Sequence, residues 1–239
     1  MPELPALKYR RVGHKGADLI APGNTAASFD AALEAGVDMI EFDVLPRDPR
    51  DPSSDLVLAH DYDHDLSGAA TLDEGLEHLK AEAFAAVELQ VDLKWHGYEA
   101  RVVDALRAHG LVERTLVSTM EERSLPVIRA LEPGLRLGWS VPKVKRDYTQ
   151  SLLTRYPAYA LLVYAKRVLP RRAAKRLRAK EIDALMAHWL LITPRLVRAV
   201  KEAGGELYAW TVDDPERIAR LERLGVTGII SNDPRLFAS

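Results

Sequence analysis

The sequence contains no cysteine among its 239 residues. Disulfide bonds and thiolate metal sites are therefore excluded, and any metal ion must be bound by carboxylate, imidazole or carbonyl groups. The sequence also lacks an apolar run approaching the ~20 residues that span a bilayer, and its first residues lack the basic and then apolar order of a secretion signal. From the absence of a membrane span and of a secretion signal we expect a cytoplasmic protein; the absence of cysteine does not itself decide the compartment.

Acidic residues are scarce in one part of the chain. Residues 143–180 contain twelve lysines or arginines and a single acid, Asp147, which gives this segment a charge of +11. The rest of the chain must carry −13 to reach the net charge of −2. Such a separation indicates either a surface that meets an anionic partner, such as a membrane, or a solvated helix face.

The bulk composition is that of a globular protein, with 47% hydrophobic and 28% charged residues. No internal repeat or linker is evident, so we expect residues 1–239 to form one α/β domain. Short β-rich runs alternate with helical stretches, which predicts βα units and a parallel sheet. The candidate strands are residues 9–14, 38–44, 55–60, 86–94, 114–119, 135–141, 182–187, 206–212 and 226–231.

The candidate strands number nine, one more than a (β/α)8 barrel needs, so at least one must be peripheral or wrong. Between them we expect helices at residues 25–35, 97–109, 193–203 and 215–224, the first capped by Asn24 or Thr25 and ended by Gly36. The Pro- and Asp-rich residues 47–54 predict a loop. Residues 143–180 fit no βα unit and predict a mostly helical excursion.

Two carboxylates alternate with apolar residues in one candidate strand, residues 40–44, so Glu41 and Asp43 project from the same face. In a barrel surrounded by helices that face is the interior, which favours metal binding over a solvent-exposed role. Asp92 and Lys94 share a face in the same way. The simplest interpretation is that Asp92 and Lys94 form an ion pair with one another.

Two histidines, His14 and His60, each end a candidate strand at its carboxyl end, where parallel barrels assemble their active sites. A single histidine at a strand end is more often structural than catalytic. Two of them beside carboxylates predict a site that hydrolyses a charged ester. Trp139 and Trp210 are either packing residues or walls of the substrate pocket.

Seven short segments resemble, in order, the motifs of the glycerophosphodiester phosphodiesterases. Residues 13–17 and 22–25 are similar to the His-Arg-Gly and Pro-Glu-Asn-Thr opening of that family. The other matching segments are residues 41–44 (Glu-x-Asp-Val), 58–61 (His-Asp), 89–94 (Leu-Asn-Ile-Glu-x-Lys), 210–213 (Trp-Thr-Val-Asn) and 225–232 (Gly-Val-Asp-Gly-Ile-Ile-Thr-Asp). Residues 143–180 have no match. One such motif is weak evidence, but seven in the family's order identify the chain as a member.

The resemblance implies a TIM (β/α)8 barrel with two catalytic histidines, His14 and His60. One takes a proton from a glycerol hydroxyl of the substrate, which attacks phosphorus, and the other protonates the departing alcohol, before water opens the cyclic phosphate. It further implies one divalent cation on a carboxylate cluster, for which oxygen ligands favour Mg²⁺ or Ca²⁺. The implied cation ligands are Glu41, Asp43 and Asp92, the implied phosphate contacts Lys15 and Lys94, and the implied pocket residues Trp210 and Trp139.

Three positions depart from the family pattern. Lys15 stands in place of arginine and keeps the charge without the bidentate fork. Asp92 replaces a glutamate and shortens its reach by one methylene group. Gly23 replaces the glutamate of Pro-Glu-Asn-Thr and deletes a carboxylate. Because both histidines, Glu41 and Asp43 are kept, we expect activity to be retained.

Three functions are compatible with these residues. The first is hydrolysis of small glycerophosphodiesters, and the second is a lysophospholipase D type of reaction on lipid at a membrane surface, for which the basic segment would provide the contact. The third is a non-catalytic phosphodiester-binding module. No nucleic-acid-binding motif is present, so we expect no nucleic-acid partner.

Overall fold

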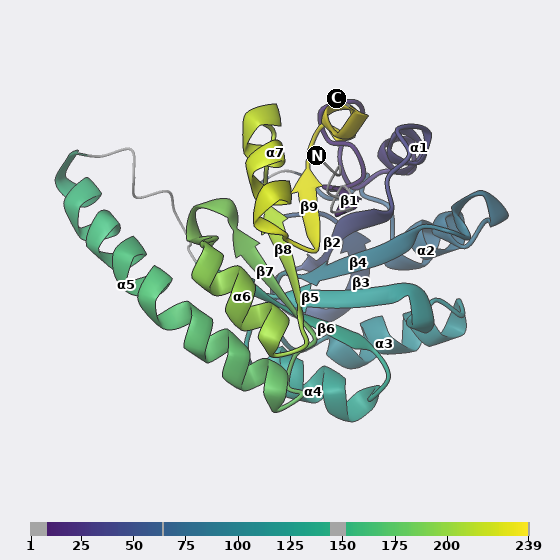
Figure 1. The fold of residues 1–239 in the computed structure, drawn as a ribbon. Coiled ribbons are helices and arrows are strands. Elements are labelled where there is room, and N and C mark those ends of the chain that lie inside the picture. The colour runs from purple at the N-terminus through teal and green to yellow at the C-terminus, as the bar shows by residue number, and fades with distance from the viewer. Residues whose placement is uncertain (1–8, 64, 144–151, 239) are drawn as a thin grey trace.

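Eight parallel strands close into a barrel in the computed structural model, which describes residues 9–63, 65–143 and 152–238 (Figure 1). The closure is made by β1, which pairs with β2 on one side and with β9 on the other. Around the barrel the strands are β1 (Arg10–Gly13), β2 (Met39–Asp48), β4 (Glu88–Leu93), β5 (Thr115–Thr119), β6 (Arg136–Val141), β7 (Ala184–His188), β8 (Glu206–Trp210) and β9 (Gly228–Ser231). The fold is therefore a TIM barrel, as expected.

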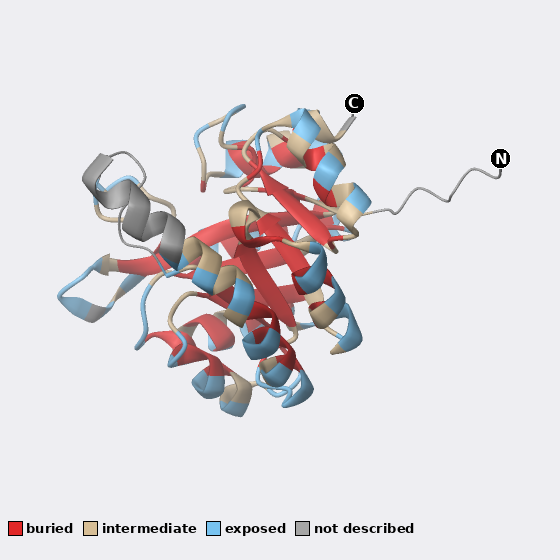
Figure 2. Ribbon diagram, turned by 60° about the vertical axis from the view of Figure 1, so that its left-hand side comes forward, coloured by how far each residue is buried: buried red, intermediate tan, exposed pale blue. Residues whose placement is uncertain are grey.

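Seven helices of the described chain connect the strands and cover the outside of the barrel (Figure 1). They are α1 (Ala26–Glu34), α2 (Leu72–Leu79), α3 (Glu99–Ala108), α4 (Ser124–Leu131), α5 (Leu152–Arg178), α6 (Pro194–Glu202) and α7 (Pro215–Leu224), with 3-10 turns at Glu82–Phe84, Val112–Arg114, Trp189–Leu191 and Pro234–Ala238. Their buried faces and the strands beneath them form one continuous apolar layer, whereas the outer helix faces are exposed (Figure 2).

The interior of the barrel has its own smaller apolar cluster, because successive side chains of a strand point alternately inward and outward. It is filled by Val12, Met39, Leu116, Ala184, Met186, Tyr208 and Ile230. Below it, at the amino-terminal end of the strands, two arginines and two glutamates from four alternate strands form a ring of ion pairs. The pairs are Arg10–Glu88, Arg10–Glu206, Arg136–Glu88 and Arg136–Glu206.

The surplus candidate strand, at residues 55–60, lies outside the barrel. β3 (Asp51–Leu58) runs antiparallel to β2, with Asp51 opposite Asp48 and Leu58 opposite Val44. The loop expected at residues 47–54 is therefore wrong for most of its length. Both strands continue into it, and the turn between them is short. A local pattern of turn residues did not reveal this because the strand pairing supplies the backbone hydrogen bonds.

The basic segment is helical from Leu152 onward, which confirms the expected excursion, while residues 144–151 lie outside the described part. α5 is much longer than the other helices, and its first part extends past the body of the molecule (Figure 1). Within the described residues, no helix combines the length and the apolar character needed to cross a membrane.

Candidate active site

Three carboxylates meet inside the carboxyl-terminal mouth of the barrel. Glu41 and Asp43 point inward from β2, and Asp92 points inward from the neighbouring β4, where it lies opposite Asp43 in the strand register. All three are buried, and one oxygen from each lies within 4.8 Å of the others. The structure thus brings together the three residues for which the sequence predicts metal binding.

Lys94 partly neutralises this cluster. Its ammonium group lies 2.5 Å from Asp43 Oδ1 and 2.8 Å from Asp92 Oδ2, so the pairing of Asp92 with Lys94 expected from the sequence is present. Burial opposes the charged form of Lys94, but Asp43 and Asp92 outweigh burial and raise the pKa of Lys94 above its usual value. The lysine is therefore a permanent cation within the site.

The carboxyl groups of Glu41 and Asp43 differ in environment although they lie on the same strand. Burial and the neighbouring charge of Asp43 raise the pKa of Glu41 well above its ordinary value. Burial would also raise the pKa of Asp43, but Lys94, together with His60 and His14, lowers it. Asp43 is consequently the fixed anion of the pair, and Glu41 is the carboxylate that most needs a further cation.

His14 follows β1 and reaches the cluster from the opposite edge of β2. Its Nε2 lies 3.8 Å from Glu41 Oε2, and its Nδ1 lies 2.6 Å from Asn232 Oδ1. The amide of Asn232 is oriented because its Nδ2 donates to Asp213 Oδ2 at 2.7 Å. An amide oxygen only accepts, so Nδ1 of His14 carries the proton and Nε2 faces the carboxylates. Burial lowers the pKa of His14, which favours this neutral form.

His60 reaches the same mouth by a different route from the one expected. It does not end a barrel strand; instead, the β2–β3 hairpin leaves the mouth and returns to it, so that Leu58 lies opposite Val44 and His60 follows two residues later. Its imidazole contributes to lowering the pKa of Asp43 and its Nδ1 lies 3.0 Å from Asp61 Oδ2. With 47% of its side chain exposed, His60 stands at the solvent side of the site.

Asp92 is oriented by polar side chains that the sequence analysis did not single out. Ser118 Oγ on β5 donates to Asp92 Oδ1 at 2.6 Å, and Gln90 Nε2 on β4 donates to Ser118 Oγ at 3.1 Å. Asn24 and Asn232 were also missed as site residues. A usable signal was present: polar residues alternate with apolar ones within otherwise buried strands, and both asparagines lie in segments that resemble the family's motifs.

Of the two pocket tryptophans, only Trp210 lies at the mouth. It ends β8, and its ring meets His188 edge-to-face at 5.3 Å. Trp139 does not belong to the site. It alternates with the inward-facing Ser140 on β6 and so packs in the outer layer, where Arg176 of α5 lies 4.6 Å from its ring centroid. Its expected role in the pocket is corrected for this reason, in favour of packing.

The carboxylate cluster fits a hard divalent cation. Its donors are all oxygen atoms, as Mg²⁺ and Ca²⁺ prefer. Asp43 Oδ1 is buried, and its cationic neighbour is Lys94 Nζ at 2.5 Å. This lysine leaves part of the negative charge of the three carboxylates unbalanced, which favours a further cation in the cluster.

A (β/α)8 barrel whose carboxyl-terminal mouth combines two imidazoles, a lysine and a carboxylate cluster that could hold a metal ion defines a class of enzymes, hydrolases of anionic esters. The sequence profile of the glycerophosphoryl diester phosphodiesterase family matches residues 14–82 and 80–236. The chain therefore belongs to this family, and it is a phosphoric diester hydrolase.

Known relatives extend over nearly the whole chain. A glycerophosphodiester phosphodiesterase of Caldanaerobacter subterraneus is 27% identical over 95% of this chain and 96% of its own length. A solved glycerophosphodiester phosphodiesterase from Parabacteroides distasonis shares the fold with a TM-score of 0.72 at 18% identity, covering 97% of this chain and 99% of that one. An Oleispira antarctica phosphodiesterase, solved with the product sn-glycerol-3-phosphate, has a TM-score of 0.68 at 22% identity, covering 95% and 96%.

Proposed function

We propose that this protein hydrolyses glycerophosphodiesters to glycerol 3-phosphate and an alcohol, with His14 and His60 as the acid–base pair. The observation that carries the proposal is the position of both histidines at the barrel mouth that holds the carboxylate cluster. His14 Nε2 lies 3.8 Å from Glu41 Oε2, and His60 follows β3, whose Leu58 lies opposite Val44, the residue after Asp43. Titratable groups that interact this closely at a barrel mouth are typical of catalytic sites. The product of the Oleispira antarctica relative supports sn-glycerol 3-phosphate as the fragment that the site retains.

The proposed reaction needs one proton acceptor and one proton donor. One imidazole takes the proton of a glycerol hydroxyl, whose oxygen attacks phosphorus while the bond to the leaving alcohol breaks. The other imidazole protonates that alcohol, and water then opens the cyclic phosphate with the roles of the imidazoles reversed. For His14 the exchanging atom is Nε2, since Nδ1 is bound to Asn232. Histidine suits both roles because its ordinary pKa is ~6.5.

Glu41, Asp43 and Asp92 would hold one Mg²⁺ or Ca²⁺ ion. When bound, the cation would neutralise charge on the phosphate and orient the glycerol hydroxyls. Lys15 and Lys94 would contact phosphate oxygens, Lys15 from the loop after β1 and Lys94 from the end of β4. Trp210 would form a wall of the pocket for the rest of the substrate.

A panel of glycerophosphodiesters and lysolipids, assayed with Mg²⁺, with Ca²⁺ and with EDTA, tests this function. We expect release of glycerol 3-phosphate from at least one soluble diester, supported by a divalent cation and lost in EDTA. Binding of a glycerophosphodiester by calorimetry without any product would instead establish a non-catalytic binding module. Turnover restricted to lysolipids would establish the lipid-directed reaction.

We also propose that the basic segment contacts an anionic membrane surface, through an exposed stripe on α5. Tyr164, Arg167, Arg171, Lys175 and Arg178 are exposed and recur every three or four residues, which places them on one side of the helix. Leu161 and Tyr164, 67% and 63% exposed, supply apolar contact area at one end. Cations beside exposed apolar residues on one helix face suit the interface of an anionic bilayer.

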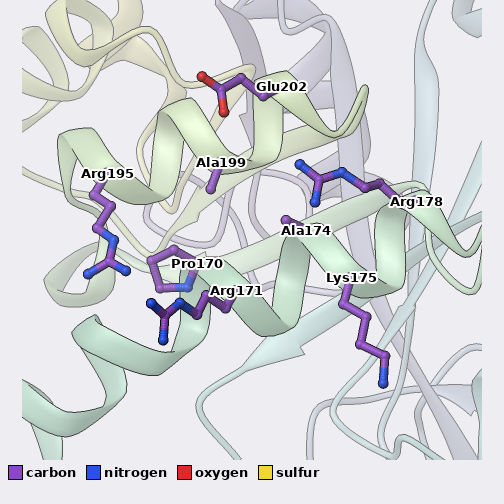
Figure 3. A pocket seen from close by; sticks show the side chains of 8 residues that line it. All are labelled: Pro170, Arg171, Ala174, Lys175, Arg178, Arg195, Ala199 and Glu202. Carbon is purple, nitrogen blue, oxygen red and sulfur yellow. The ribbon is translucent and has the colours of Figure 1, made fainter.

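The cations of this stripe have no carboxylate partner within the described chain. Three of them, Arg171, Lys175 and Arg178, line a surface pocket between α5 and α6 together with Arg195, and Glu202 is the single acid in its lining (Figure 3). By contrast, Arg176 on the packed side of α5 pairs with Glu122 and Glu181. The unpaired cations are therefore available to lipid phosphates.

Vesicle sedimentation tests the membrane contact. We expect the protein to bind vesicles containing phosphatidylglycerol at low salt and to dissociate as the salt concentration rises. The variant Arg171→Gln/Lys175→Gln should bind less, whereas Arg220→Gln/Arg223→Gln, which removes the same charge from α7, should bind like the parent protein. Equal loss in both variants would mean attraction by overall charge, and absence of binding at low salt would refute the contact.

A further inference from the structure

The position of Gly23, where the family pattern has a glutamate, is occupied in space by a different carboxylate. A Cβ atom on Gly23 would lie 2.4 Å from Asp18 Oδ1 and 2.9 Å from Lys15 Cβ, closer than atoms can approach. The backbone N–H of Gly23 donates to the same Asp18 Oδ1 at 3.0 Å. The absence of a side chain at residue 23 is thus what allows Asp18 to bring its carboxylate to this place.

The other oxygen of Asp18 holds Lys15. Lys15 Nζ donates to Asp18 Oδ2 at 3.2 Å, and both side chains are only partly exposed. At its other end, the backbone N–H of Lys15 donates to Glu41 Oε2 at 2.9 Å. Lys15 also has a positive φ of 51°, a backbone conformation that a lysine adopts only where its surroundings enforce it. Contacts at the backbone and at the ammonium group therefore fix this residue beside the carboxylate cluster.

Lys15 lies close enough to His14 for its charge to contribute to the lowered pKa of that histidine. A lysine side chain has several rotatable bonds, and holding its ammonium group in one place requires a partner. Asp18 is the only partner of Lys15 Nζ among the described residues. Without Asp18, the ammonium group would be free to leave the neighbourhood of His14.

We propose that Asp18 is a positioning residue that takes the place of the missing carboxylate at residue 23 and fixes the ammonium group of Lys15 for the substrate phosphate. The inference rests on the proposed function, because it assigns Lys15 to phosphate binding. It goes beyond that function in naming Asp18, beside the glycine at residue 23, as the residue through which this chain keeps a carboxylate in the loop after β1. The two positions should be interchangeable as carboxylate sources.

A carboxylate swap tests this proposal. Asp18→Ala and Asp18→Asn should each raise KM for a glycerophosphodiester about three- to tenfold while kcat changes less. The reason is that the ammonium group of Lys15, which binds the substrate phosphate, loses the contact that orients it. The double variant Asp18→Ala/Gly23→Glu should return KM toward the parent value, because removing the Asp18 carboxylate relieves the 2.4 Å contact and a shift of a few tenths of an ångström relieves the 2.9 Å contact with Lys15 Cβ. Gly23→Glu alone should lower the thermal midpoint, since its Cβ would collide with Asp18.

The matched control is Asp104→Ala, which removes an aspartate that pairs with a cation three residues away, Arg107, on the outer helix α3. Its KM should remain that of the parent. Asp18→Asn keeps the size of the side chain and guards against a variant that merely fails to fold. If both Asp18 variants keep the parent KM, or if the double variant is no better than Asp18→Ala, the proposal is overturned, whereas the proposed function falls only if the parent protein itself forms no product.

Discussion

Asn24 and Asp43 bind one another through two reciprocal hydrogen bonds. Asn24 Nδ2 donates to Asp43 Oδ2 at 3.0 Å, and the backbone N–H of Asp43 donates to Asn24 Oδ1 at 2.9 Å. Thr25, not Asn24, caps α1, so the amide of Asn24 remains free for this contact. The pair ties the loop after β1 to β2 and fixes the carboxylate that is central to the site.

Replacing Asn24 should therefore destabilise the protein as well as the site. We expect Asn24→Gly to lower the free energy of unfolding by about 2–3 kcal/mol, because a buried carboxylate and a buried N–H lose their partners. Asn24→Ala should cost about 1 kcal/mol more, since φ is 59° here and only glycine adopts this conformation without strain. Denaturant titration of both variants measures the cost of the lost hydrogen bonds and the cost of the backbone strain. Equal stabilities of the two variants would contradict the strain argument.

The two lysines of the site should differ in their effect on stability. Lys94 is enclosed with two buried carboxylates, and removing it as Lys94→Met should cost about 3–5 kcal/mol because the remaining charges are left unpaired. Lys15 pairs with the partly exposed Asp18, so Lys15→Met should cost under about 1 kcal/mol. Unfolding free energies of the two variants, each compared with the parent, decide this. A larger loss for Lys15 than for Lys94 would be the contrary result.

A divalent cation should stabilise the folded protein, because it binds the carboxylate cluster only when the barrel has formed. At a hundred times its dissociation constant, Mg²⁺ or Ca²⁺ should add about 2.7 kcal/mol. Glu41→Gln should abolish this gain. Without metal, however, the variant should be at least as stable as the parent, since burial and the charge of Asp43 disfavour ionised Glu41 and raise its pKa. The measurement is the thermal midpoint of the parent and of Glu41→Gln, each with the metal and with EDTA.

The ring of ion pairs at the amino-terminal end of the barrel provides a contrast between stability and activity. Arg136 pairs with Glu88 and Glu206 on two other strands, at the end of the barrel opposite to the active site. Arg136→Met should lower the free energy of unfolding by about 1–3 kcal/mol, because two glutamates lose a partner in a partly enclosed place. Turnover by the folded fraction should be unchanged; a reduced kcat would show that the two ends of the barrel are coupled.

Much of the barrel could be predicted from sequence because its signals are local. The alternation of Glu41 and Asp43 with apolar residues predicted an inward-facing acidic strand, and Gly36, with a φ of 73°, follows the end of α1 as the sequence pattern indicated. The identity of the extra strand could not be predicted, because antiparallel pairing of β3 with β2 depends on contacts that a β-rich run does not encode. Helices α2 and α4, of eight residues each, were not among the helices named from the sequence.

The parts of the site that escaped prediction depend on the path of the chain in space, through barrel closure in one case and through a loop in another. Asn232 reaches His14 across 218 residues of sequence, because β1 and β9 are neighbours in the closed barrel. Asp18 reaches Gly23 through the path of one loop, which no residue pattern specifies. Trp139 was misplaced for a related reason: on β6 the inward positions Gly138 and Ser140 are small, so the polar and apolar alternation that marks a strand face is weak there.

The two histidines should separate catalysis from stability. His60 is half-exposed and pairs only with the adjacent Asp61 among the described residues, so His60→Ala should leave the unfolding free energy within about 0.5 kcal/mol of the parent. His14 is enclosed and bound to Asn232, and His14→Ala should cost about 1–3 kcal/mol. Each should lower kcat about 10²- to 10⁴-fold, as expected for loss of a general acid or base. His78→Ala on α2, which removes a histidine paired with Asp30 outside the barrel, should retain the parent kcat. Near-normal turnover by His60→Ala would refute the two-histidine mechanism even if the metal and the carboxylates behave as described.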